Sequence, residues 1–116
     1  MTVLTLDLKE RSYDITIGSS LLSDVEKYID LNRKVLILTD DGVPKEYSEA
    51  VEAKAKDAYI YTVKSGEESK SIDSFEKILS FMLKAGFSRG DLLISVGGGV
   101  VGDLGAFVAS AYMRGI

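Results

Sequence analysis

Hydrophobic and polar positions follow two different periods along this chain, which predicts strands and helices in turn. Residues 2–8 and 13–17 alternate apolar and polar side chains on either side of the polar segment 9–12, a pattern typical of a β-hairpin. Residues 35–38 are a continuous apolar run, which indicates a strand buried on both faces of a parallel sheet, and residues 92–96 predict a further buried strand. A further strand is predicted at residues 58–63.

Four segments between and after these strands carry helical spacing. Residues 21–29 place apolar side chains at i, i+3 and i+4 behind the potential caps Ser19 and Ser20. Residues 72–83 form the clearest amphipathic helix, and Gly86 is well placed to end it. The other two predicted helices are residues 44–56, which open on the only proline, and the mostly apolar residues 100–113.

The order β-β-α-β-α-β-α-β-α predicts an α/β fold. Repeated βα units fold into a Rossmann-like, doubly wound and mostly parallel sheet with helices on both faces. The first two strands add an N-terminal β-hairpin to it. The last helix is largely apolar and the chain stops just after it, so we expect residues 1–116 to be an incomplete N-terminal domain.

Composition removes several classes of function. The chain has 116 residues, a net charge of −4 and no Cys, His or Trp, so it offers no disulfide, thiolate, histidine base or His/Cys zinc site. The acidic balance without a basic run argues against nucleic-acid binding. The apolar segment 92–113 holds Asp103 and five glycines, which argues against a membrane span. With no targeting signal at its start, we expect a cytoplasmic protein.

The loops that follow the parallel strands carry the candidate chemistry, because ligands of such sheets bind at the carboxyl ends of the strands. Residues 97–103 read GGGVVGD, and Gly97, Gly99 and Gly102 satisfy G-x-G-x-x-G between a strand and a helix. Glycines let backbone N–H groups approach a pyrophosphate, which the helix N-terminus stabilises. The alternative is a tight turn whose glycines only permit helix–sheet packing.

Other polar residues at the same edge each have two interpretations. Asp103 is either a dipole-complementing carboxylate or an acceptor for a ligand hydroxyl. In the loop 65–70, Glu67 and Lys70 could contact ribose and phosphate, or the loop could be merely solvated. Asp40 could bind a ribose or begin an Asx-turn. Arg114 could clamp a phosphate or carboxylate, or simply favour a helix C-terminus.

Taken together, these segments resemble the signature of the 3-dehydroquinate synthase family of sugar-phosphate cyclases. The resemblance rests on residues 97–105, 107–109 and 112–116, with Gly66, Glu67 and Lys70 and residues 10–15 in the right order and spacing. It implies a lyase of the shikimate pathway that uses bound NAD and a divalent metal, zinc or cobalt. The substrate is a seven-carbon sugar phosphate, and the family is usually dimeric.

The resemblance also implies roles for particular residues. Asp40 resembles a ribose-binding aspartate, although Gly42 stands where the family often has Asn. Arg114 resembles a substrate-binding arginine. The remaining implied contacts are to NAD: Ser65, Gly66, Glu67, Glu68, Ser69, Lys70, Gly98, Gly99, Val100, Val101, Gly102 and Asp103.

The metal ligands of the family, one Glu and two His, belong to a C-terminal helical region, so we expect this chain alone to hold no metal and to be inactive. Three alternatives stay open from the sequence. They are a related cyclase such as one of the 2-deoxy-scyllo-inosose synthase type, a metal-dependent polyol dehydrogenase, and a non-catalytic nucleotide-binding module.

Overall fold

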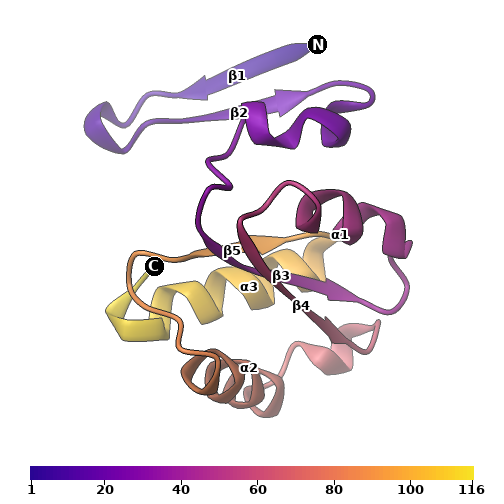
Figure 1. Ribbon diagram of the computed structural model, residues 1–116, viewed down its shortest axis with the longest axis vertical. Coiled ribbons are helices and arrows are strands. Elements are labelled where there is room, and N and C mark those ends of the chain that lie inside the picture. The colour runs from indigo at the N-terminus through magenta and orange to yellow at the C-terminus, as the bar shows by residue number, and fades with distance from the viewer.

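Five strands form two separate sheets in the computed structural model, which describes residues 1–116. β1 (Thr2–Leu6) and β2 (Tyr13–Ile17) pair antiparallel across a short 3-10 turn, Lys9–Arg11, and stand apart from the other strands at the top of Figure 1. The other sheet is parallel and has the order β4-β3-β5. Its strands are β3 (Lys34–Asp40), β4 (Asp57–Val63) and β5 (Leu92–Ser95).

Helices cover both faces of the parallel sheet. α1 (Lys45–Glu52) lies on one face together with a 3-10 segment, Leu21–Lys27. α2 (Ile72–Lys84) and α3 (Gly99–Ala111) lie on the other. None of these helices has the length and apolar character needed to cross a membrane.

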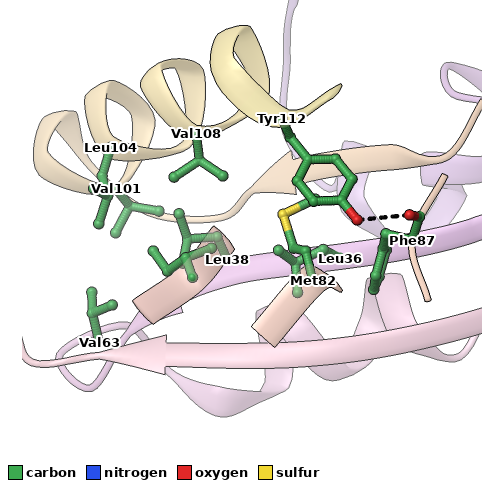
Figure 2. Packing of buried hydrophobic residues seen from close by; sticks show 10 residues of the cluster. Leu36, Leu38, Val63, Met82, Phe87, Val101, Leu104, Val108 and Tyr112 are labelled. Atoms are coloured by element: carbon green, nitrogen blue, oxygen red, sulfur yellow. Dashed lines mark hydrogen bonds between the residues drawn. The ribbon is translucent and has the colours of Figure 1, made fainter. Parts of the chain in front are cut away.

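The central strand β3 divides the core between the two faces. Its side chains alternate, so Val35 and Ile37 pack with α1 while Leu36 and Leu38 pack with α2 and α3, and all four are fully buried. Figure 2 shows Leu36 and Leu38 beneath the apolar face of α3. A strand buried on both faces explains the continuous apolar run in the sequence.

The end of α3 is fixed by a buried hydrogen bond. The Tyr112 hydroxyl donates to the Phe87 carbonyl oxygen at 2.7 Å, across the loop that leads into β5 (Figure 2). Burial raises the pKa of Tyr112, as expected for a phenol removed from water. The contact therefore ties the residue that follows α3 to the segment between α2 and β5.

The predicted α/β class, the parallel sheet and the hairpin are confirmed, with boundaries that differ by a few residues. The helix predicted at 21–29 is wrong in type: residues 21–27 are 3-10, with a kink at Asp24. Ser20 adopts a left-handed conformation and makes no side-chain cap, and only Val25 of this segment is buried. Without a cap or a long buried face, the segment lacks the interactions that stabilise a regular α-helix.

The strand order sets where a ligand can enter. β3 leads to β4 on one side, and the chain then crosses to β5 on the other side of β3. The helices that follow β3 and β5, α1 and α3, therefore lie on opposite faces of the sheet, and open α/β sheets bind ligands at the carboxyl ends of two such strands.

Close packing of α3 on β5 depends on Gly105. A Cβ at this position would overlap the Ser95 hydroxyl oxygen and crowd Leu93 at 3.2 Å, whereas a Cβ at Gly102, on the same helix, would meet nothing within 4 Å. We expect Gly105→Ala to lower the free energy of unfolding by about 1–3 kcal/mol in urea titrations. Gly102→Ala is the matched control and should be neutral or stabilising by up to about 1 kcal/mol. Equal effects of the two substitutions would contradict this packing.

Candidate functional site

Three loops meet at the carboxyl edge of the parallel sheet and are joined by hydrogen bonds. The Val96 amide donates to the Leu38 carbonyl at 2.8 Å, and the Thr39 hydroxyl donates to the Val96 carbonyl at 2.8 Å. On the other side of β3, the Asp41 carboxylate accepts from the Ser65 amide at 2.8 Å. The loops after β3, β4 and β5 thus form one continuous surface.

The glycines after β5 divide into two kinds. Gly97 has φ +155°, and a Cβ there would crowd Val101 and Val43 at 3.1–3.3 Å, so this glycine makes the turn possible. A Cβ at Gly98, Gly99 or Gly102 would meet nothing within 4 Å. These three glycines leave open space above the backbone, and packing does not require them.

α3 begins at this open surface without a side-chain cap. Its N-cap is Gly98, and no side chain accepts a hydrogen bond from the first turn. The first N–H groups of the helix have no partner within the helix, and the helix dipole is positive here. Val101 is fully buried in the core, so only its backbone amide can serve a ligand at this place. The start of α3 therefore suits an anionic group.

Lys70 connects the loop after β4 to the first turns of α3. Its Nζ lies 2.9 Å from Asp103 Oδ2 and 3.5 Å from Glu67 Oε2. The hydrogen bond and charge of Asp103, with the charge of Glu67, raise the pKa of Lys70. The pair is exposed, at 42% for Lys70 and 66% for Asp103, so it adds little to stability and stays available to a ligand.

Two residues of the loop 65–70 shape the loop itself. Gly66 has φ +113°, a conformation that L side chains rarely adopt, and the carboxylate of Glu68 lies close to it. Ser69 is buried, and its hydroxyl donates to the Lys64 carbonyl oxygen. A contact of Ser69 with a ligand would therefore need its backbone.

Asp40, at the end of β3, forms the Asx-turn that the sequence allowed. Its Oδ1 accepts from the amides of Gly42 at 2.8 Å and Val43 at 3.1 Å. A Cβ at Gly42 would crowd that carboxylate at 3.3 Å and would make an ordinary contact with the Ser65 Cβ at 3.4 Å. Ribose binding by Asp40 stays a prediction.

Sequence reasoning missed Asp41, which joins two of the loops. Hydrogen bonding from Ser65 lowers the pKa of its carboxyl group and keeps it ionised at neutral pH. The pattern Asp40-Asp41 marked the right loop, but no feature of the sequence showed which of the two carboxylates would reach the next strand's loop.

Arg114 lies away from this surface. It is exposed and follows the C-terminal end of α3, whereas the glycine loop opens the same helix. A helix of 13 residues is roughly 20 Å long. Arg114 therefore does not join the other candidate residues on the sheet edge, and its contact with a substrate stays a prediction.

No three His, Cys, Asp or Glu side chains of the chain converge on a position where they could hold a metal ion. Each carboxylate of these loops has a different partner instead. Asp40 accepts from amides of its own turn, Asp41 accepts from the Ser65 amide, and Asp103 pairs with Lys70. The arrangement offers an anion site at α3 flanked by hydrogen-bond acceptors.

A parallel sheet of this order, with an uncapped glycine loop at its carboxyl edge, places the chain among the doubly wound α/β domains that bind ligands at this edge. Comparison with known proteins narrows the class. Residues 60–116 match the family model described as 3-dehydroquinate synthase N-terminal. The 3-dehydroquinate synthase of Clostridium acetobutylicum is 37% identical over 123 residues, and that of Clostridium botulinum is 41% identical over 127 residues.

Both alignments cover 100% of this chain and 35% of the relative, so the chain spans about a third of the length of the curated relatives it matches. Solved structures agree in fold. 2-Deoxy-scyllo-inosose synthase superposes with a TM-score of 0.86 at 26% identity, over 99% of this chain and 34% of that one. The 2-epi-5-epi-valiolone synthase of Streptomyces hygroscopicus gives 0.75 at 26% identity, over 95% and 32%. Over its whole length, the chain is therefore similar to the N-terminal third of 3-dehydroquinate synthases.

The pairing of Lys70 with Asp103 predicts a measurable titration. Because its pKa is raised, the stability that this ion pair contributes is present below the ordinary lysine value of 10.5 and is lost as the pH rises above it. Asp103→Asn should move the pKa of Lys70 down toward 10.5, as followed by side-chain NMR. Lys77, which pairs with Asp73 at 3.0 Å, should keep its raised pKa and serves as the internal control. If the pKa of Lys70 is the same in the variant as in the parent chain, the ion pair does not form in solution.

Proposed function

We propose that the chain is the NAD-binding part of a 3-dehydroquinate synthase, the lyase that converts 3-deoxy-D-arabino-heptulosonate 7-phosphate to 3-dehydroquinate and phosphate. The observation that carries the proposal is the junction of Lys70 with Asp103. It brings the loop after β4 against the helix that opens at Gly98, Gly99 and Gly102. Two solved neighbours support it, since one is a complex with NAD⁺ and Co²⁺ and the other has NAD⁺ and Zn²⁺ bound.

The open glycines fit the pyrophosphate of NAD. Gly98 and Gly99 carry no side chain and border open space. Phosphate oxygens can therefore approach the free N–H groups at the start of α3. Lys70 adds a positive charge at the same place. When bound, NAD supplies a hydride acceptor for transient oxidation of a substrate hydroxyl. The part of this chain is to bind the cofactor and hold its orientation.

The carboxylates around this surface suit the hydroxyl groups of a ribose. Asp103 is exposed and has one oxygen on Lys70, and Asp40 is fixed in orientation by its turn. Because each carboxylate is already held by a hydrogen bond or an ion pair, ligand binding does not have to immobilise these side chains and loses less conformational entropy. We assign Asp40 and the loop 65–70 to the nucleoside and Asp103 to a hydroxyl nearer the reacting end.

The divalent metal, zinc or cobalt, fits no group of side chains in these 116 residues. We propose that it is bound by a further region of a longer polypeptide, which also completes the sugar-phosphate site, and that the working enzyme is a cytoplasmic homodimer. The hairpin offers a surface for such contacts. Leu4, Tyr13, Ile15 and Ile17 lie on one face of it and are 42–55% exposed.

A related cyclase is the second candidate, because 2-deoxy-scyllo-inosose synthase matches the fold with a TM-score of 0.86. The identity favours 3-dehydroquinate synthase, at 37% and 41% against 26%.

The open position of Gly99 gives a variant that separates binding from folding. Gly99→Asp places a carboxylate in the first turn of α3. There it interacts favourably with the helix dipole and stabilises the helix, but it repels a pyrophosphate. We expect the variant to unfold at the same or higher urea concentration than the parent chain while its affinity for NAD falls at least about tenfold, by calorimetric titration. Gly102→Ala, also at an open position, is the control for stability. Parent-like NAD affinity in Gly99→Asp would place the cofactor elsewhere.

Activity is tested in a chimera. Residues 1–116 of this chain replace the aligned N-terminal region of the Clostridium acetobutylicum relative, and phosphate release from the heptulosonate phosphate is measured with NAD and zinc. We expect release by the chimera, release only at higher NAD concentrations by its Gly99→Asp form, and none by the 116-residue chain alone. Turnover by the isolated chain would contradict the assignment of the metal site to another region. A folded chimera that binds NAD but releases no phosphate would contradict the assignment of this chain to a 3-dehydroquinate synthase.

A further inference from the structure

The chain makes an unusual turn directly after α3. The Gly115 amide donates to the Tyr112 carbonyl at 2.8 Å, and both residues between them have positive φ, +46° at Met113 and +66° at Arg114. Two such angles are characteristic of a type I′ turn, in which Gly, Asn and Asp are the usual residues. Other side chains are disfavoured there because the Cβ crowds the following carbonyl oxygen. The two other non-glycine residues with positive φ occur singly, so this is the one adjacent pair.

Contacts on both sides hold this turn in place. Before it, Tyr112 is buried, and its hydroxyl donates to the Phe87 carbonyl at 2.7 Å (Figure 2). After it, the Ile116 amide donates to the Ala109 carbonyl at 2.9 Å, and the Ile116 side chain packs against the core beneath α3. The link between these two fixed residues is only three residues long. Disfavoured backbone conformations persist where surrounding contacts impose them in this way, and they are frequent at functional sites.

The side chain that this turn presents has no partner within the chain. Arg114 is exposed, and its guanidinium forms no ion pair. Arg33 and Arg89, in contrast, donate to backbone carbonyls at Gly90 and Gly115. A planar guanidinium binds a phosphate or carboxylate through two parallel hydrogen bonds, which requires a defined direction of approach. A fixed backbone with a free guanidinium therefore suits an anion from outside the chain.

We propose that Tyr112 is a positioning residue: its buried hydroxyl holds the left-handed turn and so sets the direction in which Arg114 meets an anionic group of the substrate. The proposal rests on the proposed function, in which that group is the phosphate or carboxylate of the sugar phosphate. Because a further region of a longer polypeptide completes the sugar-phosphate site, the substrate need not lie at the start of α3. Tyr112 touches no substrate and acts through the backbone of Met113 and Arg114.

The hold of Tyr112 on the turn is measured first, in the labelled 116-residue chain by NMR. Positive φ gives strong NOEs between the amide and the Hα of the same residue, so we expect them at Met113 and Arg114. Tyr112→Phe keeps the ring and removes only the hydroxyl, and both NOEs should weaken. Tyr47→Phe is the matched control, because Tyr47 is 46% exposed, and it should leave them unchanged. NOEs that stay strong in Tyr112→Phe would overturn the proposal.

The effect on the reaction is measured in the chimera. Tyr112→Phe should raise KM for the heptulosonate phosphate about three- to tenfold and leave kcat and NAD affinity unchanged, because it weakens binding of the substrate only. Arg114→Ala should raise KM at least as much. In the Arg114→Ala background, Tyr112→Phe should have no further effect, since there is no guanidinium left to position. Effects that multiply, or a parent-like KM in Tyr112→Phe, would show a merely structural role and overturn the proposal.

A second pair of variants decides the question if Tyr112→Phe does not fold. Met113 is 45% exposed, so Met113→Val and Met113→Asn both remove its side chain without opening the core. Only the β-branched Val resists positive φ, whereas Asn tolerates it. We expect a raised KM in Met113→Val and a parent-like KM in Met113→Asn, and equal values would overturn the proposal. A parent chimera without turnover would contradict the proposed function instead, and the NOE comparison needs no turnover.

Discussion

The burial of β3 on both faces determines where the other strands and helices lie. Val35, Leu36, Ile37 and Leu38 have no exposed surface, and their alternation assigns α1 to one face and α2 and α3 to the other. Since β3 also pairs with both neighbours, it fixes the register of β4 and β5. The three loops meet at one edge because the strands that lead into them are parallel and aligned on this strand.

Much of this arrangement could be predicted from local patterns. The apolar run of β3 and the helical spacing of α2 are each visible as a regular pattern of hydrophobic residues within one short segment. Once the strands are known to be parallel, the loops that follow them are expected at the same edge of the sheet. Contacts between distant residues could not be predicted in the same way. Lys70 and Asp103 are 33 positions apart, and their ion pair depends on how α3 packs. No sequence pattern predicts the unpaired hydroxyl of Ser48, because it results from the burial of one face of α1.

The glycine segment shows why a motif alone left two interpretations open. Gly97 and Gly105 serve the turn and the helix–sheet contact, where a side chain would collide with its neighbours. Gly98, Gly99 and Gly102 border open space instead. The packing interpretation therefore holds for Gly97 and Gly105, and pyrophosphate binding at the open glycines stays a prediction. Backbone conformation and tertiary contacts separate them, and neither is visible in the spacing of G-x-G-x-x-G.

We propose that the loops after β3, β4 and β5 act as one cofactor site. The most direct measurement is a titration of the ¹⁵N-labelled chain with NAD, in which amide shifts are followed residue by residue. We expect the amides in residues 40–42, 65–70 and 98–103 to shift together and to fit a single dissociation constant. Shifts confined to one loop, or loops that titrate with different constants, would contradict it.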